Sequence, residues 1–467
     1  MIKFGTSGFR AIISEDFTKE NIQKIAQSLA KIIKSKKGKK TVIVGYDRRF
    51  MSQESATWFA EVLAGNGIIT KLYSKAVPSP TVMYGVMAED LDYGVIITAS
   101  HNPYYYNGIK ICTKGGADAS NEVVSEIEKL ANSNLKIKAL DISEARDKKL
   151  IEDYDNIKDY FKHINKFVSK NLKENKLKVL FNAMHGACAE YAEMLAKMFK
   201  ISKFTLINET EDPYFERKLP CPEEDKLDDF KKQVVRGRYT IGVATDGDGD
   251  RLGVVDENGE FHDNNELMAL AYYFLVKYRG MKGDAVKNNS TSSLINKVAE
   301  HFGFKCHETA VGFKYISAKM KEVDALLGGE SSGGMTVRNY IPSKDSFFSI
   351  SIILDALATI KKPLGQIIKD IKEECGYIST CVSGAVKVKN RKKMQKAISK
   401  KTPSFSYKPV EKNTIDGTKF IFEDGSWALL RFSGTENVLR YYMEFSTEIE
   451  CERNLKAITN FIAHYGK

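Results

Sequence analysis

The sequence lacks several patterns that would settle its class at once. Its seven cysteines are odd in number and scattered, without any Cys-x-x-Cys pair, so neither a disulfide framework nor a zinc site is indicated. No uninterrupted apolar run reaches about 18 residues, the length that spans a bilayer, and residues 1–5 carry no apolar signal stretch. We therefore expect a reducing, cytoplasmic setting and no membrane partner.

Aromatic side chains do not recur among the lysines at the intervals that stacking on bases requires. The formal net charge is +11, yet the lysines are spread widely and mixed with acids, as in residues 158–176 and 287–321. This pattern is typical of a solvated surface, so no nucleic-acid partner is expected. The positive excess favours electrostatic steering of small anionic substrates.

A strict internal repeat is also absent, but the chain is long enough for several domains. Its 467 residues exceed what one hydrophobic core supports, and 43% hydrophobic and 28% charged residues are ordinary for a globular protein. Three successive units share a strand, loop and helix rhythm, and a last unit mixes strands with helices. We expect an α/β protein with domains at residues 1–150, 151–253, 254–374 and 375–467. A lysine- and acid-rich helical stretch, residues 141–176, should bridge the first two.

The most informative feature that is present is a serine directly beyond an apolar strand. The run Gly94–Ile97 reads as a buried strand, and Thr98-Ala99-Ser100-His101-Asn102-Pro103 follows it. Ligands bind in open α/β sheets beyond the carboxyl ends of strands, which is where Ser100 should lie. Most serines in turns only form local hydrogen bonds. The significance of Ser100 therefore depends on motifs elsewhere in the chain.

A second apolar strand, 240–245, ends in Asp246-Gly247-Asp248-Gly249-Asp250-Arg251. Carboxylates at alternate positions can converge on one hard cation such as Mg²⁺, and without a cation they repel one another. An EF-hand loop is the rival interpretation, because Glu257 occupies the twelfth position. It fails because Arg251 stands where such a loop needs glycine, and because both flanks read as strands. The motif therefore predicts a magnesium site rather than a solvated turn.

Two further loops carry weaker signals. The strand-like run 325–327 leads into Gly328-Gly329-Glu330-Ser331-Ser332-Gly333-Gly334, in which Glu330 and Ser332 could hold neighbouring sugar hydroxyls. The strand 427–430 leads into Arg431-Phe432-Ser433-Gly434-Thr435-Glu436. A guanidinium fork, two hydroxyls and backbone amides suit a phosphate, although an ordinary hairpin loop would look similar.

Together these motifs carry a resemblance to a known family. The segments 4–10, 98–110, 246–251, 329–333 and 431–436 stand in the order and at the approximate spacing of the α-D-phosphohexomutase family. The resemblance spans essentially the whole chain. It implies four domains around a central cleft: three similar βα-rich domains with mixed sheets and a smaller α+β C-terminal domain. Each domain would contribute one loop, for the phosphoserine, the metal, the sugar and the phosphate respectively.

The resemblance also implies residue roles and partners. It assigns catalysis to Ser100, Arg10, Lys110, His101 and Lys314, and Mg²⁺ binding to Ser100, Asp246, Asp248 and Asp250. It assigns substrate binding to Arg251, Lys287, Glu330, Ser332, Arg431, Ser433, Gly434 and Thr435. Sugar phosphates are the expected partners, glucose 1,6-bisphosphate is the expected intermediate and activator, and the chain is expected to be a monomer or homodimer.

Departures from the family pattern bear on the sugar. Gly334 stands where members acting on mannose or glucosamine phosphates commonly have histidine, which points toward glucose. Ala11, Phe432 and Asn437 change loop stiffness without removing a reacting group. We expect a mutase interconverting glucose 1-phosphate and glucose 6-phosphate. The alternatives are a phosphomannomutase or dual-specificity enzyme, a phosphoglucosamine mutase or phosphopentomutase, and a non-catalytic sugar-phosphate sensor.

Overall fold

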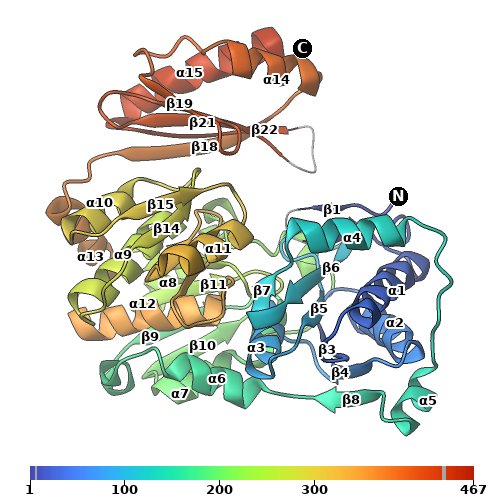
Figure 1. Ribbon diagram of the computed structural model, residues 1–467. Helices are drawn as coiled ribbons and strands as arrows, with labels where there is room; N and C mark the ends of the chain where they lie inside the picture. Colours follow the sequence, from blue (N-terminus) through green and yellow to red (C-terminus); the bar gives the residue numbers. More distant parts are fainter. Residues whose placement is uncertain (6–7, 434–437, 467) are drawn as a thin grey trace.

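The computed structural model describes residues 1–5, 8–433 and 438–466 and contains four β-sheets (Figure 1). The first sheet contains β1 (Phe4–Gly5), β2 (Gly8–Ile12), β3 (Thr41–Tyr46), β4 (Ile69–Tyr73), β5 (Tyr93–Ile97), β6 (Tyr106–Thr113), β7 (Ala117–Asp118) and β8 (Ile151–Tyr154). The second contains β9 (Lys178–Asn182), β10 (Lys203–Ile207), β11 (Ile241–Thr245), β12 (Leu252–Asp256) and β13 (Phe261–His262). The third contains β14 (Ala285–Asn288), β15 (Cys306–Thr309), β16 (Leu327–Gly329) and β17 (Met335–Val337). The fourth contains β18 (Thr380–Lys387), β19 (Glu411–Asn413), β20 (Thr418–Ile421), β21 (Trp427–Phe432) and β22 (Val438–Phe445).

Helices flank these sheets. The first unit carries α1 (Lys19–Ser35), α2 (Ser52–Gly65), α3 (Ser79–Ala88), α4 (Asn121–Ala131) and α5 (Ile142–Asp147). The second carries α6 (Ile157–Asn165), α7 (Ala192–Phe199) and α8 (Asp228–Arg236). The third carries α9 (Asn264–Lys277), α10 (Leu294–His301), α11 (Phe313–Val323), α12 (Ser346–Ile360) and α13 (Leu364–Glu374), and the fourth carries α14 (Arg391–Lys400) and α15 (Glu448–Tyr465). None of the described helices has both the length and the apolar character of a membrane span.

The first three sheets share one core topology. The strand orders β4-β3-β5-β6, β10-β9-β11-β12 and β15-β14-β16-β17 are equivalent, with three parallel strands and a fourth that runs antiparallel. The fourth sheet is antiparallel throughout. The predicted fold class, with three similar α/β domains and a smaller α+β domain, is therefore confirmed.

The sheets extend past two of the domain boundaries expected from the sequence. β8 begins at Ile151 but pairs with β4 in the first sheet, and β12 runs through residue 253 to Asp256 in the second. The expected helical bridge over residues 141–176 contains α5 and α6, but also the strand β8 between them, which the sequence did not predict. Two charged residues, Glu152 and Asp153, lie exposed on this edge strand. Charged side chains commonly protect edge strands from pairing with other chains. Here they also break the hydrophobic pattern by which the strand could have been predicted.

The expected strand at 325–327 lies two residues further on, as β16. Glycines are poor strand formers, so Gly328 and Gly329 were assigned to a loop from the sequence. Gly328 nevertheless suits the sheet because α11 packs closely on it: an added Cβ would lie 2.3 Å from Met320 Sδ. The shift brings Glu330 directly to the carboxyl end of the strand.

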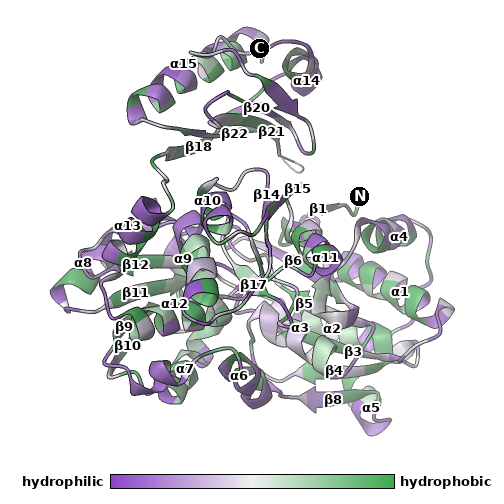
Figure 2. Ribbon diagram, turned by 60° about the vertical axis from the view of Figure 1, so that its left-hand side comes forward, coloured by the Kyte–Doolittle hydropathy of each residue, from purple (hydrophilic) through white to green (hydrophobic). Residues whose placement is uncertain are grey.

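Separate apolar cores divide the molecule into a body and a last domain. One continuous core extends from Ile43 to Tyr377 and includes side chains of the first three domains, such as the buried helix α12. The last domain has its own core, from Val388 to Ile462. Figure 2 shows the hydrophobic strands β9, β11 and β12 in the body and the last domain set apart from them. The last domain can therefore be repositioned without opening the core of the body.

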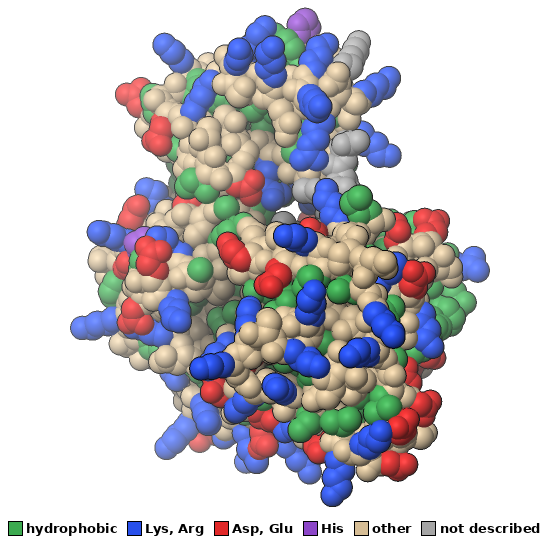
Figure 3. Space-filling view, turned by 45° about the vertical axis from the view of Figure 1, so that its right-hand side comes forward, with side chains coloured by type: hydrophobic (Ala, Val, Ile, Leu, Met, Phe, Trp, Pro, Cys, Tyr) green, Lys and Arg blue, Asp and Glu red, His purple; other side chains and the backbone are tan. Residues whose placement is uncertain are grey.

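Polar contacts join the last domain to the third. Asn289 Nδ2 donates to Asp416 O at 2.9 Å, Val311 N donates to Asp416 Oδ2 at 3.1 Å, and Lys419 Nζ pairs with Glu308 Oε2 at 2.6 Å. Figure 3 shows a narrow hollow between the last domain and the body, and basic side chains spread over this face among acidic ones. Hydrogen bonds and ion pairs of this kind are compatible with relative domain motion.

Candidate active site

Three of the four expected functional loops occupy the same place in their sheets. Each connects the third parallel strand to the antiparallel one: β5 to β6, β11 to β12 and β16 to β17. Asp246 and Glu330 directly follow their strands, and Ser100 lies three residues beyond β5. Because carboxyl ends of parallel strands form one edge of each sheet, this repeated position directs the loops toward ligands.

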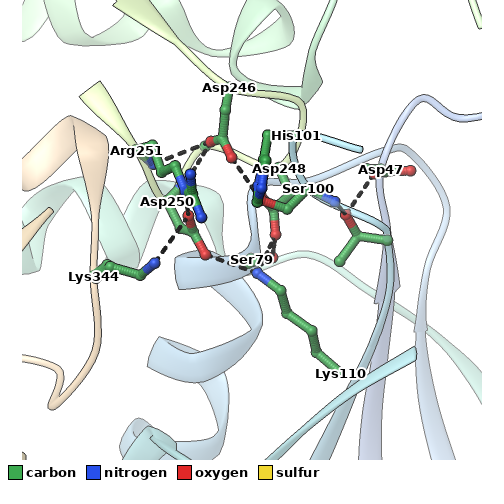
Figure 4. Close-up of polar contacts among 12 residues, drawn as sticks. Asp47, Ser79, Ser100, His101, Lys110, Asp246, Asp248, Asp250, Arg251 and Lys344 are labelled. Carbon is green, nitrogen blue, oxygen red and sulfur yellow. Dashed lines mark hydrogen bonds and ion pairs between the residues drawn. The ribbon is translucent and has the colours of Figure 1, made fainter. Parts of the chain in front are cut away.

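Ser100 is buried and has left-handed backbone geometry, with φ of 53°. Its amide donates to Thr98 Oγ1 at 2.8 Å, and Thr98 Oγ1 donates to the buried Asp47 at 2.6 Å. Its own Oγ donates to Asp246 Oδ2 at 2.7 Å, and His101 Nδ1 lies 3.2 Å from the same oxygen (Figure 4). A non-glycine residue with positive φ is strained and often marks a functional position. The structure therefore fixes the hydroxyl of Ser100 against the predicted metal loop.

The three aspartates of the metal loop converge, as the sequence predicted. Carboxylate oxygens of Asp246, Asp248 and Asp250 lie within 4.8 Å of one another, and all three residues are buried. Asp248 Oδ1 and Asp250 Oδ1 accept no hydrogen bond from any residue that the structure describes. Buried carboxylate oxygens without donors need a cation, and an all-oxygen set suits Mg²⁺. The residues present therefore fit a magnesium ion held by these carboxylates and an oxygen on Ser100.

Lys110 lies beneath this loop and neutralises part of its charge. Its ammonium donates to Asp248 Oδ2 at 2.5 Å and to Asp250 Oδ2 at 2.7 Å, and Ser79 Oγ donates to Asp248 Oδ2 at 2.6 Å. Burial alone would lower the pKa of Lys110, but Asp248 and Asp250 outweigh it and raise the pKa. Lys110 therefore stays charged and holds two of the three carboxylates in place.

Asp246 has a different electrostatic environment from its neighbours. Burial, together with the charges of Asp248 and Asp250, raises the pKa of Asp246 to about 8. Its Oδ1 accepts the amides of Asp250 and Arg251, both at 3.0 Å. The pKa of Asp250 is instead lowered, because Lys110, Lys344 and Arg251 outweigh its burial. Asp246 is thus the member of the set whose charge most depends on a bound cation.

His101 turns toward Ser100 more closely than its adjacent position in sequence suggested. Burial, followed by the charges of Arg251 and Arg10, holds its pKa well below the ordinary value, so the imidazole is neutral. Arg10 lies on β2 and donates to Asn102 Oδ1 at 2.6 Å, which ties it to the serine loop. Arg251 Nε lies 3.9 Å from Asp250 Oδ1. These predicted cations are therefore gathered around Ser100.

The sugar loop lies beside the metal loop. Glu330 is buried and accepts from Asn288 Nδ2 at 3.1 Å and from Ser332 Oγ at 2.8 Å. Lys344 Nζ lies 3.6 Å from Asp250 Oδ1 (Figure 4). It also lies 3.6 Å from Glu330 Oε1, so it bridges the two loops. Ser332 is exposed whereas Glu330 is buried.

Other predicted residues lie apart from Ser100. Lys314 Nζ donates to Asn121 Oδ1 at 2.5 Å, which joins the third domain to the first. Lys287 Nζ donates to the carbonyls of Thr291 and Ser292. The structure does not bring these two lysines into contact with the serine or the aspartates.

The predicted phosphate loop is partly described. Arg431 Nε pairs with Asp416 Oδ2 at 2.7 Å, and Ser433 N donates to Val438 O at 2.9 Å. The predicted ligands Gly434 and Thr435 lie outside the described residues. Arg431 therefore belongs to the same cluster, around Asp416, that joins the last domain to the third.

Comparison with known proteins decides the family. Four family models, described as phosphoglucomutase/phosphomannomutase α/β/α domains I, II and III and C-terminal domain, match residues 1–138, 158–259, 263–375 and 385–460 in that order. The chain belongs to the α-D-phosphohexomutase superfamily. Enzymes of this family are isomerases that transfer a phosphoryl group within a sugar.

Relatives of this phosphohexomutase match it over nearly their whole length. A phosphoglucomutase/phosphomannomutase of Thermococcus kodakarensis is 28% identical over 97% of this chain and 96% of the relative. A phosphoglucosamine mutase of Clostridioides difficile is 27% identical over 98% of both. A crystal structure of a phosphoglucomutase/phosphomannomutase family protein from Burkholderia thailandensis has the same fold, with a TM-score of 0.83 at 21% identity over 100% of this chain and 98% of that one.

Two residues of this phosphohexomutase's site were missed by the sequence reasoning. Arg49 is buried and donates to the carbonyl oxygens of Ser100, Asn102, Pro103 and Tyr106, at 2.6, 2.6, 3.0 and 3.1 Å. It follows β3 just as Ser100 follows β5, so its position beyond a parallel strand was an available signal. Lys344 offered no such signal, because it lies in a loop before α12.

Proposed function

We propose that this protein is a Mg²⁺-dependent phosphohexomutase that interconverts α-D-glucose 1-phosphate and glucose 6-phosphate through a phosphoserine at Ser100 and bound glucose 1,6-bisphosphate. The observation that carries the proposal is the 2.7 Å contact between Ser100 Oγ and Asp246, within a set of three buried carboxylates. A sensor of sugar phosphates would need a binding cleft but no nucleophilic oxygen held against a metal site.

The chemistry follows from the groups around Ser100. In the forward step, the bond from phosphorus to Ser100 Oγ breaks and a bond to the free sugar hydroxyl forms, while the hydroxyl proton passes to a base. Asp246, Asp248 and Asp250 would hold Mg²⁺, which when bound would offset the charge that spreads over the phosphoryl oxygens. Arg10 and Arg251 supply further positive charge beside the loop.

The phosphoryl group moves between Ser100 Oγ and the sugar hydroxyl, and these two oxygens need different proton carriers. In-line displacement puts the sugar hydroxyl on the far side of phosphorus from Ser100 Oγ. The neutral His101 imidazole, 3.2 Å from Oγ, is therefore placed to manage the proton of the serine oxygen. We assign the sugar hydroxyl to Lys314, which would have to leave Asn121 to reach it.

The intermediate must turn around so that its second phosphate can return to Ser100. While one phosphate reacts, the other needs a separate site, which we assign to the loop that begins at Arg431. The polar contacts of Asp416 and Lys419 with the third domain allow the last domain to move during this exchange.

Two features of the sugar loop support glucose. Gly334 has φ of 86°, and an added Cβ would lie 2.6 Å from Lys344 Cβ and 2.8 Å from Asp250 O, so Lys344 fills the space that an imidazole would need. The Lys344 ammonium beside Glu330 would also repel the protonated amino group of glucosamine phosphate, whereas a neutral hydroxyl meets no such penalty.

A phosphoglucosamine mutase is the second candidate, favoured by the name of the Clostridioides difficile relative. Mannose 1-phosphate, which differs from glucose 1-phosphate only at one carbon, belongs to the same comparison because of the Thermococcus kodakarensis relative.

The test is a coupled mutase assay with Mg²⁺ and a trace of glucose 1,6-bisphosphate on glucose 1-phosphate, mannose 1-phosphate and glucosamine 1-phosphate. We expect the highest kcat/KM for glucose 1-phosphate, no turnover by Ser100→Ala, and a much higher Mg²⁺ requirement in Asp248→Asn. Peptide mass spectrometry should find phosphate on Ser100. Preference for glucosamine 1-phosphate would overturn the sugar assignment, and turnover by Ser100→Ala would overturn the mechanism.

A further inference from the structure

A second cluster of metal-ligating side chains lies outside the active site, at the turn between β12 and β13. Asp256 ends β12, His262 ends β13, and Glu260 lies between them. One oxygen of each carboxylate and one ring nitrogen lie within 4.8 Å of one another. β13 follows the turn and leads directly into α9, so the cluster stands at the junction of the second and third domains.

Two deeply buried atoms in this cluster lack hydrogen-bond partners. Asp256 is fully buried, and its Oδ1 accepts the amides of Asn258 and Glu260 at 2.9 Å. Asp256 Oδ2 and His262 Nε2 make no hydrogen bond with any residue that the structure describes, although His262 is only 6% exposed. Such orphaned atoms are rare in native interiors and call for a partner.

The separation of these two atoms suits a shared metal better than a hydrogen bond. Asp256 Oδ2 and His262 Nε2 lie 3.5 Å apart. An N–H···O hydrogen bond is shorter, at about 2.7–3.2 Å. Two ligands of one tetrahedral Zn²⁺, each about 2.0–2.2 Å from it, stand roughly 3.4 Å apart.

The other ring nitrogen of His262 has the hydrogen-bond partner that a metal-binding histidine usually has. His262 Nδ1 lies 2.8 Å from Glu266 Oε2, and Lys372 in turn holds Glu266 at 2.5 Å. A carboxylate that accepts from Nδ1–H leaves the lone pair on Nε2 for a metal and fixes the ring orientation.

A glycine of α13 leaves room at the point where the ligand atoms meet. A Cβ added to Gly365 would lie 2.9 Å from Asp256 Oδ2, 3.8 Å from His262 Nε2 and 3.9 Å from Glu260 Oε2. The three atoms therefore converge beside the first turn of α13, and α13 belongs to the third domain. A cation bound there would join the turn of the second domain to α13, the last helix of the third.

We propose that Asp256, Glu260 and His262 form a structural site for a divalent transition metal, with Zn²⁺ as the best-fitting ion, and that Glu266 positions His262 for it. Imidazole nitrogen favours Zn²⁺ over Mg²⁺, whereas the all-oxygen active site favours Mg²⁺, so the two sites differ in the ion they select. The site is separate from the phosphoryl-transfer chemistry and does not depend on the proposed sugar.

The test uses the full chain, stripped with a chelator and dialysed into excess Mg²⁺ so that the active site is filled. Titration with Zn²⁺ by calorimetry, with metal analysis after gel filtration, should show one bound Zn²⁺ per chain and a rise in Tm. Binding should be lost in His262→Gln and weakened at least tenfold in Glu260→Ala, whose side chain is exposed and whose fold should be unchanged. Glu266→Gln should weaken binding about 10–100-fold.

Two further variants locate the ion. Glu257→Gln, a carboxylate of the same turn outside the cluster, should bind Zn²⁺ like wild type, and so should Asp248→Asn in the active site. No bound Zn²⁺ in the wild type would overturn the proposal and leave His262 as an imidazolium between Asp256 and Glu266. Binding that survives in both His262→Gln and Glu260→Ala would overturn it as well.

Discussion

Arg49 Nη2 donates to the carbonyl oxygen of Ser100 at 2.6 Å, so the backbone of the proposed nucleophile is held by a residue from a different strand end. The same guanidinium reaches three further carbonyls of the loop. Its Nε lies 3.4 Å from the buried Asp47, which in turn accepts from Thr98. The loop that carries the Ser100 hydroxyl is therefore held by the Arg49–Asp47 ion pair and by hydrogen bonds, and Ser100 itself has a strained backbone conformation.

Replacing Arg49 by lysine should damage both stability and turnover. A lysine keeps the charge but cannot present the fork that spans four carbonyls, so buried acceptors lose their donors at about 1–3 kcal/mol each. We expect a loss of about 2–4 kcal/mol in the free energy of unfolding and at least a tenfold fall in kcat, measured by urea unfolding and the mutase assay.

Arg48→Lys is the matched control, because Arg48 is also buried but contacts Glu190 and the carbonyl of Glu209 instead of the serine loop. It should lose stability while kcat stays near the wild-type value. Equal falls in kcat for the two variants would contradict a specific role of Arg49 in positioning Ser100.

Ser100→Gly should be inactive yet more stable than Ser100→Ala. At φ of 53° a side chain costs roughly 1–2 kcal/mol, which glycine avoids. Both variants lack the nucleophilic oxygen, so neither should turn over or carry phosphate at residue 100. Thermal unfolding should rank Gly above Ala by about 1 kcal/mol, and the reverse order would mean that the left-handed geometry does not persist in the variants.

The sequence predicted those parts of the site in which local chemistry determines position. Ser100 and Asp246 could be placed because each follows an apolar strand, and a parallel strand fixes where its end lies. Arg49 was missed despite a similar position, because its function depends on four carbonyls about 50 residues away that only the folded sheet brings near it. Local pattern carries no information about such partners.

Lys344 and Lys314 both show that the sequence alone does not tell which lysine lies at the site. Lys344 bridges the metal and sugar loops, yet nothing around it in sequence distinguishes it from other lysines. Lys314 was assigned a catalytic role through the family resemblance, but its ammonium contacts Asn121 across a domain interface. Which lysine lies near the sugar thus depends on how the domains sit together, which strand and helix patterns do not encode.

Gly334→Ala should lower both stability and activity. The substitution puts a Cβ at φ of 86° and 2.6 Å from Lys344 Cβ, so the sugar loop or Lys344 must move. Such changes commonly cost about 1–3 kcal/mol. We expect KM for glucose 1-phosphate to rise, since Glu330 depends on Lys344. Gly303→Ala is the control: it also has positive φ, but its Cβ would meet no atom within 4 Å. If the two variants showed the same KM, crowding at Lys344 would not be the cause.

The pH dependence of stability should change when Asp345 is replaced by asparagine. Asp345 is buried at the start of α12, and burial raises its pKa to about 6, although Tyr340, Tyr160 and the amide of Phe348 donate to it. A carboxyl whose pKa is raised on folding contributes stability that is fully present below its unfolded pKa of about 4 and is lost as pH rises through about 6.

Asparagine has no such titration. Its one carbonyl oxygen can still accept from Tyr160 and the amide of Phe348, while its NH2 replaces the oxygen that accepts from Tyr340, and that loss does not depend on pH. Relative to wild type, Asp345→Asn should therefore become more stable as pH increases from 4 to 7, by up to about 3 kcal/mol. Tm measured at several pH values for both proteins checks this, because titrations shared by the two cancel in the difference. A difference in Tm that stays constant from pH 4 to 7 would show that Asp345 has an ordinary pKa in the folded protein, and that its hydroxyl and amide donors fully offset its burial.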